Sequence, residues 1–165
     1  MIIVSDTSPI NNLAAINQFH LLHQLYETVI IPEAVYRELT DPDFPVAGAT
    51  EVQTFDWIQI RQVSNRTVVE VLENDLDTGE AEAIALALEL KADQLLIDER
   101  RGRTIAANLN LRFTGIIGIL VEAKSQKLIP TVQPVLDSLI NQAGFWIAES
   151  LYKHVLRLVG EDDAI

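Results

Sequence analysis

Residues 95–106 read LLIDERRGRTIA, and this stretch decides the predicted fold class. Its first three residues are apolar, as at the end of a buried strand, and Asp98 follows where the apolar run stops. A helix is predicted to begin directly afterwards, with Glu99 near the positive end of its dipole. If this strand belongs to an open α/β sheet, Asp98 lies where such sheets bind ligands, outside the carboxyl ends of their strands.

The rest of the chain repeats this alternation of strands and helices. Short apolar segments predict strands at residues 2–4, 28–31, 58–63, 94–97 and 112–114. Helices are predicted at residues 8–16, 32–40, 50–57, 79–92, 99–110 and 115–127, and Ser8 is predicted to cap the first of them. Short apolar strands that alternate with helices predict a central, mainly parallel sheet with helices on both faces.

The length of 165 residues predicts a single domain, residues 1–165, with a helical C-terminal end at about residues 131–160. No run approaches the ~18 apolar residues of a membrane span, and the first residues lack the basic segment of a secretory signal. The chain contains no cysteine, which excludes disulfide frameworks and thiolate metal sites. We therefore expect a cytoplasmic protein without a membrane partner.

Acidic residues recur at the predicted ends of strands and starts of helices. Asp6 follows the first strand, Asp98 follows the fourth, and Glu38 lies near the edge of the apolar face of helix 32–40. Glu80 and Glu82 both lie near the start of helix 79–92, and the sequence leaves open which of them points to the sheet edge. Each acid also has a structural interpretation, for example Asp98 as a helix cap. Taken together, we expect these acids to share one pocket at the carboxyl ends of the strands.

Such a pocket predicts a metal site. Clustered carboxylates repel one another and take up protons unless cations are present. Ligand sets made only of oxygen suit the hard ions Mg²⁺ and Mn²⁺. Ions held in this way can activate water for attack on a phosphodiester and stabilise the leaving oxygen.

The net charge of −12 is unfavourable for a nucleic-acid ligand, so RNA binding needs a local basic patch. Arg100, Arg101 and Arg103 provide one directly behind Asp98. Arg100 and Arg101 oppose the dipole of the predicted helix, which indicates an anionic ligand or acidic neighbours. Phosphate contacts and ordinary salt bridges to surface acids are the two interpretations that the sequence leaves open.

Four segments, in this order, resemble PIN-domain proteins, and most closely the short prokaryotic group related to the VapC-type toxins of toxin–antitoxin pairs. They are VSDTSPI (4–10), PEAVYREL (32–39), LDTGEAEAIALALELKADQLLIDERRGRTIA (76–106) and TGIIGIL (114–120). The resemblance covers roughly residues 1 to 130. It implies a three-layer αβα sandwich with an acidic pocket that binds Mg²⁺ or Mn²⁺, and ribonuclease activity.

Residue by residue, the resemblance places the family's acids on Asp6, Glu38, Glu80 and Asp98. Glu82 competes with Glu80 for the third position, and Thr7 is expected to orient Asp6 or a bound water. The chain departs from the family where Thr114 and Gly115 stand in a region that often carries a further Asp, which leaves the number of metal ions open.

We therefore predict a metal-dependent endoribonuclease that acts as the toxin-like half of a toxin–antitoxin pair, with RNA as substrate and an antitoxin protein as partner. The alternative is a PIN-fold interaction module with weak or no catalysis. Helix 8–16 and the tail residues Phe145, Trp146 and Leu151 are the predicted surfaces for a partner or for a homo-oligomer. Metal titration separates the two interpretations, since an interaction module need not bind Mn²⁺ at the acids.

Overall fold

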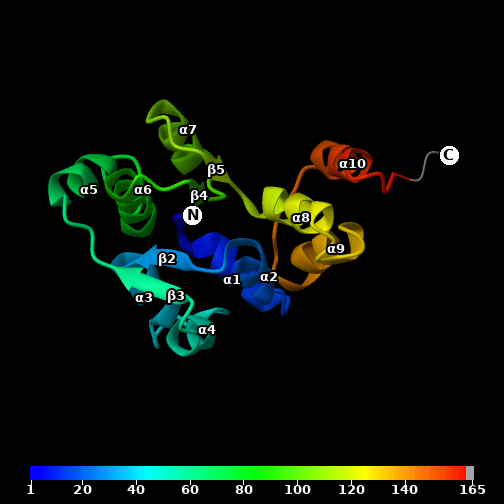
Figure 1. Cartoon of the computed structure of the whole chain (residues 1–165), viewed down its shortest axis with the longest axis horizontal. Coiled ribbons are helices and arrows are strands. Elements are labelled where there is room, and N and C mark those ends of the chain that lie inside the picture. Colours follow the sequence, from blue (N-terminus) through cyan, green and yellow to red (C-terminus); the bar gives the residue numbers. More distant parts are fainter. Residues whose placement is uncertain (163–165) are drawn as a thin grey trace.

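Five parallel strands form the centre of the protein in a computed structural model that describes residues 1–162 (Figure 1). The strands lie in the order β3-β2-β1-β4-β5, so the direction of winding reverses between β1 and β4. Every pair of neighbouring strands is parallel. Their bounds are β1 Ile3–Ser5, β2 Val29–Pro32, β3 Ile58–Arg61, β4 Gln94–Leu96 and β5 Phe113–Thr114.

The central strands β1 and β4 carry apolar side chains on both faces because both faces are covered there, whereas the edge strand β3 exposes residues 59–61. Along β1, Ile3 packs in one cluster of buried side chains and Val4 in the other. Along β4, Leu95 and Leu96 divide in the same way. The predicted α/β class is confirmed, and within the described residues the sheet is wholly parallel.

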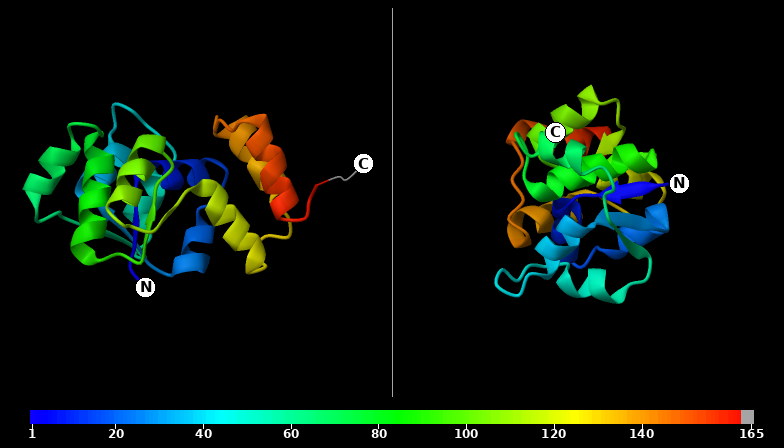
Figure 2. Two further views of the ribbon diagram at one scale, coloured as in Figure 1. Left: turned by 90° about the horizontal axis from the view of Figure 1, so that it is seen from above. Right: turned by 90° about the vertical axis from the view of Figure 1, so that its left-hand side faces the viewer.

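Helices form a layer on each side of the sheet, so the protein is an αβα sandwich (Figure 2). Side chains of one layer share a core with Ile3 and Leu96, and those of the other share a core with Val4 and Leu95. The first layer contains α1 (Thr7–Ala15), α2 (His20–Tyr26), α3 (Glu33–Thr40), α4 (Ala49–Thr54), α8 (Ile116–Ser125) and α9 (Gln133–Gln142). The second contains α5 (Arg66–Leu72), α6 (Thr78–Leu90) and α7 (Arg100–Asn108).

Two local features differ from the sequence-based expectation. The sequence does not predict helix α5, because Thr67, Val68, Val69 and Val71 are residue types that favour strands. Its start is fixed instead by Asn65, whose side chain accepts a hydrogen bond from the backbone N–H of Val68. The predicted cap Ser8 lies inside α1, which begins at Thr7 with Asp6 in the N-cap position.

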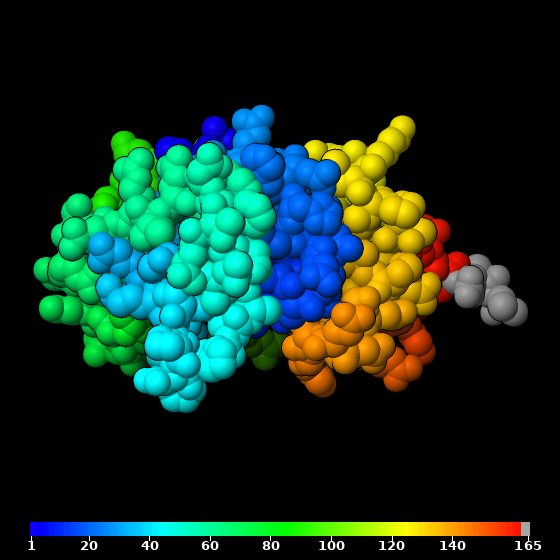
Figure 3. All heavy atoms as spheres, turned by 90° about the horizontal axis from the view of Figure 1, so that it is seen from below, coloured from blue at the N-terminus to red at the C-terminus, as the bar shows by residue number. Residues whose placement is uncertain are grey.

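The C-terminal part forms one end of an elongated molecule (Figures 1 and 3). Its last helices are α9 and α10 (Glu149–Leu158). Glu161, which follows α10, connects this segment to α8 and to the start of α9. Its carboxylate accepts hydrogen bonds from the N–H groups of Val132 and Gln133 and from Lys124 Nζ. Residues 163–165, which we include in the predicted single domain, lie outside the described residues. Among the residues described, no helix is both long and apolar enough to cross a membrane.

Candidate metal centre

Two of the predicted acids lie side by side at the point where the sheet reverses its winding. Ser5 pairs with Leu96 in the sheet, and the N–H of Asp6 donates to the carbonyl of Leu96 over 2.9 Å. Asp6 and Asp98 therefore follow the carboxyl ends of adjacent strands, β1 and β4. This edge is where open α/β sheets bind ligands.

Asp6 is 3 % exposed, and its side chain makes no capping hydrogen bond to α1 although it occupies the N-cap position. Burial raises the pKa of its carboxyl to about 7, against an opposing effect of the Thr7 backbone N–H. The negative charges of Asp77, Glu38 and Asp98 raise this pKa further. A buried carboxylate in such a field is stabilised most by a cation.

Asp98 is held by both of its oxygens. Oδ1 accepts from the backbone N–H of Ile116 at 2.8 Å, and Oδ2 accepts from Ser8 Oγ at 3.3 Å. Burial raises the pKa of the Asp98 carboxyl, while these two hydrogen bonds and the charge of Arg103 lower it. Asp98 thus connects the starts of α1 and α8 at the sheet edge.

Glu38 and Glu80 approach the same edge from α3 and α6. Thr7 Oγ1 donates to Glu38 Oε2 at 2.8 Å, so the Thr7 side chain orients Glu38. The sequence predicts that Thr7 orients Asp6 or a bound water, and the backbone N–H of Thr7 does bond Asp6. The pKa of Glu80 is raised to about 8, mainly by burial. The hydrogen bond between Glu80 and Asp77 and the negative charges of Asp77 and Asp6 raise this pKa further. The four predicted acids therefore surround one region of the surface.

Three glycines make room for three of these acids. A Cβ atom on Gly79 would lie 2.9 Å from Glu38 Oε2, and one on Gly115 would lie 2.6 Å from Asp98 Oδ1. A Cβ atom on Gly102 would lie 3.2 Å from Glu80 Oε2 and 2.6 Å from the Ile97 side chain. These glycines allow the backbone of α6, α7 and α8 to pass directly beside the carboxylates.

Glu82 does not join this group. It is 1 % exposed, its Oε1 accepts from the N–H of Ala34 at 3.0 Å, and its Oε2 pairs with Arg66 at 2.9 Å. Residues two apart in a helix point to different sides, so Glu80 faces the acids while Glu82 faces α3 and α5. The geometry favours Glu80 as the third acid.

This assignment predicts different effects for Glu80→Ala and Glu82→Ala. Glu82→Ala leaves the buried N–H of Ala34 without an acceptor, so we expect the free energy of unfolding to fall by about 1–3 kcal/mol. Arg66 is half exposed and contributes little of this. Glu80→Ala removes a carboxylate with a raised pKa and is expected to weaken Mn²⁺ binding without such a loss of stability.

Urea unfolding of the two metal-free variants measures the first effect, and calorimetric titration with Mn²⁺ measures the second. Weak Mn²⁺ binding by the Glu82→Ala protein, together with normal binding by the Glu80→Ala protein, would reverse the assignment.

The three arginines of α7 diverge from one another. Arg101 donates to the backbone carbonyl of Asp75 at 3.0 Å, and the guanidinium of Arg103 lies 5.2 Å from the centre of the Phe113 ring. Arg100 is exposed on the first turn. None of the three forms a salt bridge with any acid among residues 1–162. The charge of Arg103 lowers the pKa of Asp98.

Two residues of this region are not predicted by the sequence as part of the site. Asp77 caps α6 by accepting from the N–H of Glu80 at 2.8 Å, and its charge acts on both Asp6 and Glu80. Its place three residues before Glu80 is the available signal, but that spacing also indicates an ordinary helix cap. Arg37 lines a hollow of about 280 Å³ together with Glu38 and Asp77, and its sequence context gives no signal.

The donor set fits a divalent ion in its chemistry. All of the acids at the edge offer oxygen atoms, which Mg²⁺ and Mn²⁺ prefer, and Mg²⁺ is usually bound through one or two carboxylates and several waters. Within residues 1–162, no three Asp, Glu or His side chains converge closely enough to hold an ion by themselves.

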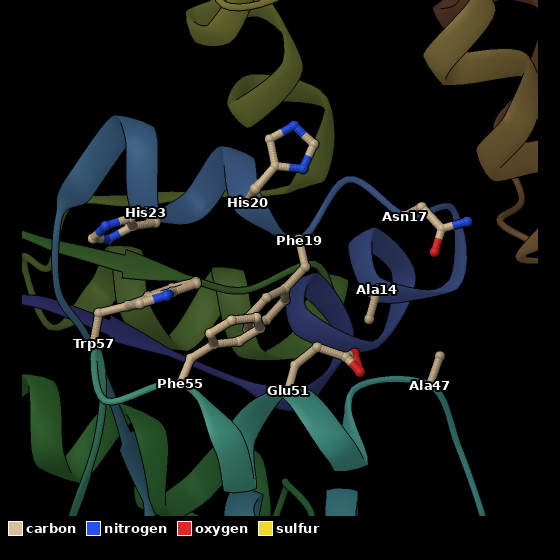
Figure 4. Close-up of a pocket in the computed structure, with 9 residues that line it drawn as sticks. All are labelled: Ala14, Asn17, Phe19, His20, His23, Ala47, Glu51, Phe55 and Trp57. Carbon is tan, nitrogen blue, oxygen red and sulfur yellow. The ribbon is translucent and has the colours of Figure 1, made fainter.

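A second cavity, of about 460 Å³, lies at the other end of α1 and beside the start of β3 (Figure 4). The Trp57 ring stacks on His23 with 4.9 Å between ring centres and contacts Phe19 over the same distance. Glu51 is the one acid among the residues that line this cavity. The cavity is separate from the acids, because Ala14 and Trp57 lie toward the amino-terminal edge of the sheet.

A wholly parallel sheet with acidic side chains at its switch point defines an α/β protein with a candidate divalent-metal site. The chain belongs to the PIN-domain family, because a model described as a PIN domain matches residues 2–161. Proteins of this family are in general nucleases, typically dependent on divalent metal ions, and their domains in general bind RNA. No curated protein matches the chain.

Proposed function

We propose that this chain is a metal-dependent endoribonuclease in which Asp6, Glu38, Glu80 and Asp98 hold Mg²⁺ or Mn²⁺. The observation that carries the proposal is the buried Asp6 carboxylate, which makes no capping hydrogen bond and is surrounded by other acids. When bound, the ions supply the activation of water and the stabilisation of the leaving oxygen in phosphodiester hydrolysis. The chain itself positions the ligands: Thr7 fixes Glu38, and Ile116 and Ser8 fix Asp98.

The arginines would bind the RNA backbone in this proposal. Arg100 and Arg101 are exposed on the first turn of α7, which begins two residues after Asp98, and they form no salt bridge to the described residues. Arg103 would lie closer to the scissile phosphate, because its charge already acts on Asp98. This placement puts a local positive field next to the site in a chain whose net charge is −12.

The direct test is cleavage of single-stranded RNA by the purified protein in Mn²⁺ or Mg²⁺. Excess EDTA is expected to stop cleavage, and a Glu80→Ala protein purified in the same way controls for contaminating ribonuclease. Undiminished cleavage in EDTA, or equal cleavage by the Glu80→Ala protein, would contradict the metal mechanism.

Replacing Arg100 and Arg101 together by Ala tests the RNA contacts. We expect weaker RNA binding and a flatter dependence of log K on log salt, by about 0.7 for each phosphate of single-stranded RNA that the protein no longer neutralises. The Lys153→Ala protein is a matched control, because Lys153 pairs with Glu149 on α10. An unchanged salt slope would show that the two arginines do not contact phosphate.

We also propose a toxin-like role in a toxin–antitoxin pair, carried out in the cytoplasm by one domain. The support is the resemblance to the VapC-related group, the absence of cysteine and the family match over residues 2–161. An antitoxin would then be the protein partner, and the adjacent reading frame is the place to look for it.

The second candidate is a PIN-fold interaction module, and exposed apolar side chains favour it. Trp146 is 82 % exposed, and Leu151 and Leu158 are 43 % and 65 % exposed. The apolar face of α1, predicted as a partner surface, is instead buried in the core through Pro9, Ile10 and Leu13. Self-association through the tail stays a prediction from the sequence. The Mn²⁺ titration decides between enzyme and module, because the module need not bind the ion.

A further inference from the structure

Asn12 lies on the second turn of α1 and is half-buried. Its Nδ2 donates to two atoms of one residue: the backbone carbonyl of Ser8 at 3.0 Å and the Ser8 hydroxyl oxygen at 3.0 Å. The same hydroxyl is 3.3 Å from Asp98 Oδ2. A chain of hydrogen bonds thus runs from Asn12 through Ser8 to Asp98.

The direction of this chain follows from the Ser8 carbonyl. A carbonyl oxygen can only accept, so the atom of Asn12 that faces it must be the amide nitrogen and not the amide oxygen. That nitrogen also reaches the Ser8 hydroxyl, which therefore receives a hydrogen bond from Asn12. A serine hydroxyl has a single hydrogen, and here that hydrogen is left to point at Asp98.

The other oxygen of Asp98 is fixed from the opposite side. Oδ1 accepts from the N–H of Ile116, the first residue of α8, at 2.8 Å. The backbone of Gly115 packs directly against this oxygen, since a Cβ atom on Gly115 would lie only 2.6 Å from Oδ1. With the Ile116 hydrogen bond alone, the Asp98 carboxylate could still rotate about that bond. The second hydrogen bond, from the Ser8 hydroxyl to Oδ2, fixes its orientation.

We propose that Asn12 is a positioning residue: it directs the Ser8 hydroxyl toward Asp98 and so sets the orientation of that carboxylate. Asn12 makes no hydrogen bond to an acid of the site and acts only through Ser8. The inference rests in part on the proposed function, in which Asp98 is a metal ligand. Partners that orient a metal ligand in this way typically change metal affinity about 10- to 100-fold when they are removed.

The test compares Asn12→Ala, Ser8→Ala and the double variant with the parent protein. Asn11→Ala is the matched control, because Asn11 lies on the same helix and its Nδ2 also makes one hydrogen bond to a carbonyl, that of Ala47, at 2.9 Å. Two quantities are measured: the exchange rate of the Ile116 amide hydrogen in metal-free protein by NMR, and the affinity for Mn²⁺ by calorimetry.

We expect the Ile116 amide to exchange roughly five- to tenfold faster in the Asn12→Ala and Ser8→Ala proteins, since Asp98 is then less firmly held as its acceptor. Mn²⁺ affinity should fall in both, and the double variant should match the Ser8→Ala protein, because Asn12 acts only through Ser8. The Asn11→Ala protein should keep the parent's values for both quantities.

The outcomes separate this proposal from the proposed function. Parent-like Ile116 exchange and Mn²⁺ affinity in the Asn12→Ala protein would overturn the role of Asn12, and so would a double variant in which the two effects simply add. If the parent binds no Mn²⁺ but Ile116 exchange still rises in the Asn12→Ala and Ser8→Ala proteins, the metal proposal fails and the positioning of Asp98 by Asn12 stands.

Discussion

Replacing Asp6 with Asn is expected to reduce Mn²⁺-dependent RNA cleavage by about 100-fold or more and, at about pH 8, to leave the metal-free protein at least as stable as the parent. These effects have opposite signs for one physical reason. The Asp6 carboxylate is buried among Glu38, Asp77 and Asp98, so its negative charge is unfavourable without a cation and useful with one.

The amide suits the position in other respects. Asn has nearly the shape of Asp and is equally good in an N-cap position, which Asp6 occupies at the start of α1. The acids around it can accept hydrogen bonds from the new NH₂ group. What is lost is the charge, so we expect cleavage to fall by about 100-fold or more, equivalent to roughly 2.7 kcal/mol of transition-state stabilisation.

Asp93→Asn is the matched control. Asp93 is exposed just before β4, at the amino-terminal edge of the sheet, and its Oδ2 accepts from the N–H of Ile2 at 2.6 Å. Cleavage assays and thermal melts with and without Mn²⁺ measure the parent and both variants. A Mn²⁺-induced rise in melting temperature that is equal in the Asp6→Asn protein and the parent, with cleavage retained, would make Asp6 a structural residue.

The elements that carry the acids are easier to predict from the sequence than the neighbours of those acids. The strands before Asp6 and Asp98 contain the apolar runs 2–4 and 95–97, so their ends can be predicted to within a residue or two. The alternation of strands and helices implies a parallel sheet, in which all carboxyl ends lie at one edge, so the sharing of this edge by both acids is predictable. That β1 and β4 are neighbours is known only from the structure. The local sequence pattern is sufficient to predict these strand ends, because a buried strand ends close to the end of its apolar run.

Contacts between distant segments are not predictable in this way. Glu80 and Glu82 must face different sides of α6, yet the choice between them depends on Arg66 of α5, a helix that the pattern does not reveal. Ser8 and Asp98 are 90 residues apart, and no spacing rule joins them. The role of Asp77 is visible only as a helix cap, because its effect on Asp6 depends on the packing of α6 against β1.

The metal-free protein is expected to lose stability as the pH rises from about 5 to about 9. Asp6 and Glu80 have pKa values of about 7 and about 8 in the folded protein, against ordinary values of 3.8 and 4.5. A carboxyl whose folded pKa is raised favours the folded state while it is protonated. The contribution of this carboxyl to the free energy of unfolding is complete below its pKa in the unfolded chain and declines above that pKa. It is lost once the pH passes the pKa of the carboxyl in the folded protein.

The size of the effect is set mainly by Asp6. A shift of about three pKa units corresponds to roughly 4 kcal/mol, and Asp6 is almost fully buried, so solvent screens little of it. Glu80 is only half-buried and adds less. Glu161, whose pKa is lowered, stays ionised across this range, so its contribution does not vary between about pH 5 and about pH 9.

Mn²⁺ should reverse this loss. The ion binds the ionised acids, so it stabilises the folded state above about pH 7, by about 2.7 kcal/mol at a free concentration about 100 times Kd. Below about pH 6 Asp6 and Glu80 are largely protonated, so the ion should stabilise the folded state less there. Urea unfolding in EDTA and in Mn²⁺ at a series of pH values measures both curves, and the Asp6→Asn protein should give a flatter curve in EDTA. Metal-free stability that is constant or rises over this pH range would show that the acids at the sheet edge do not share one field, and the metal proposal would lose its physical basis.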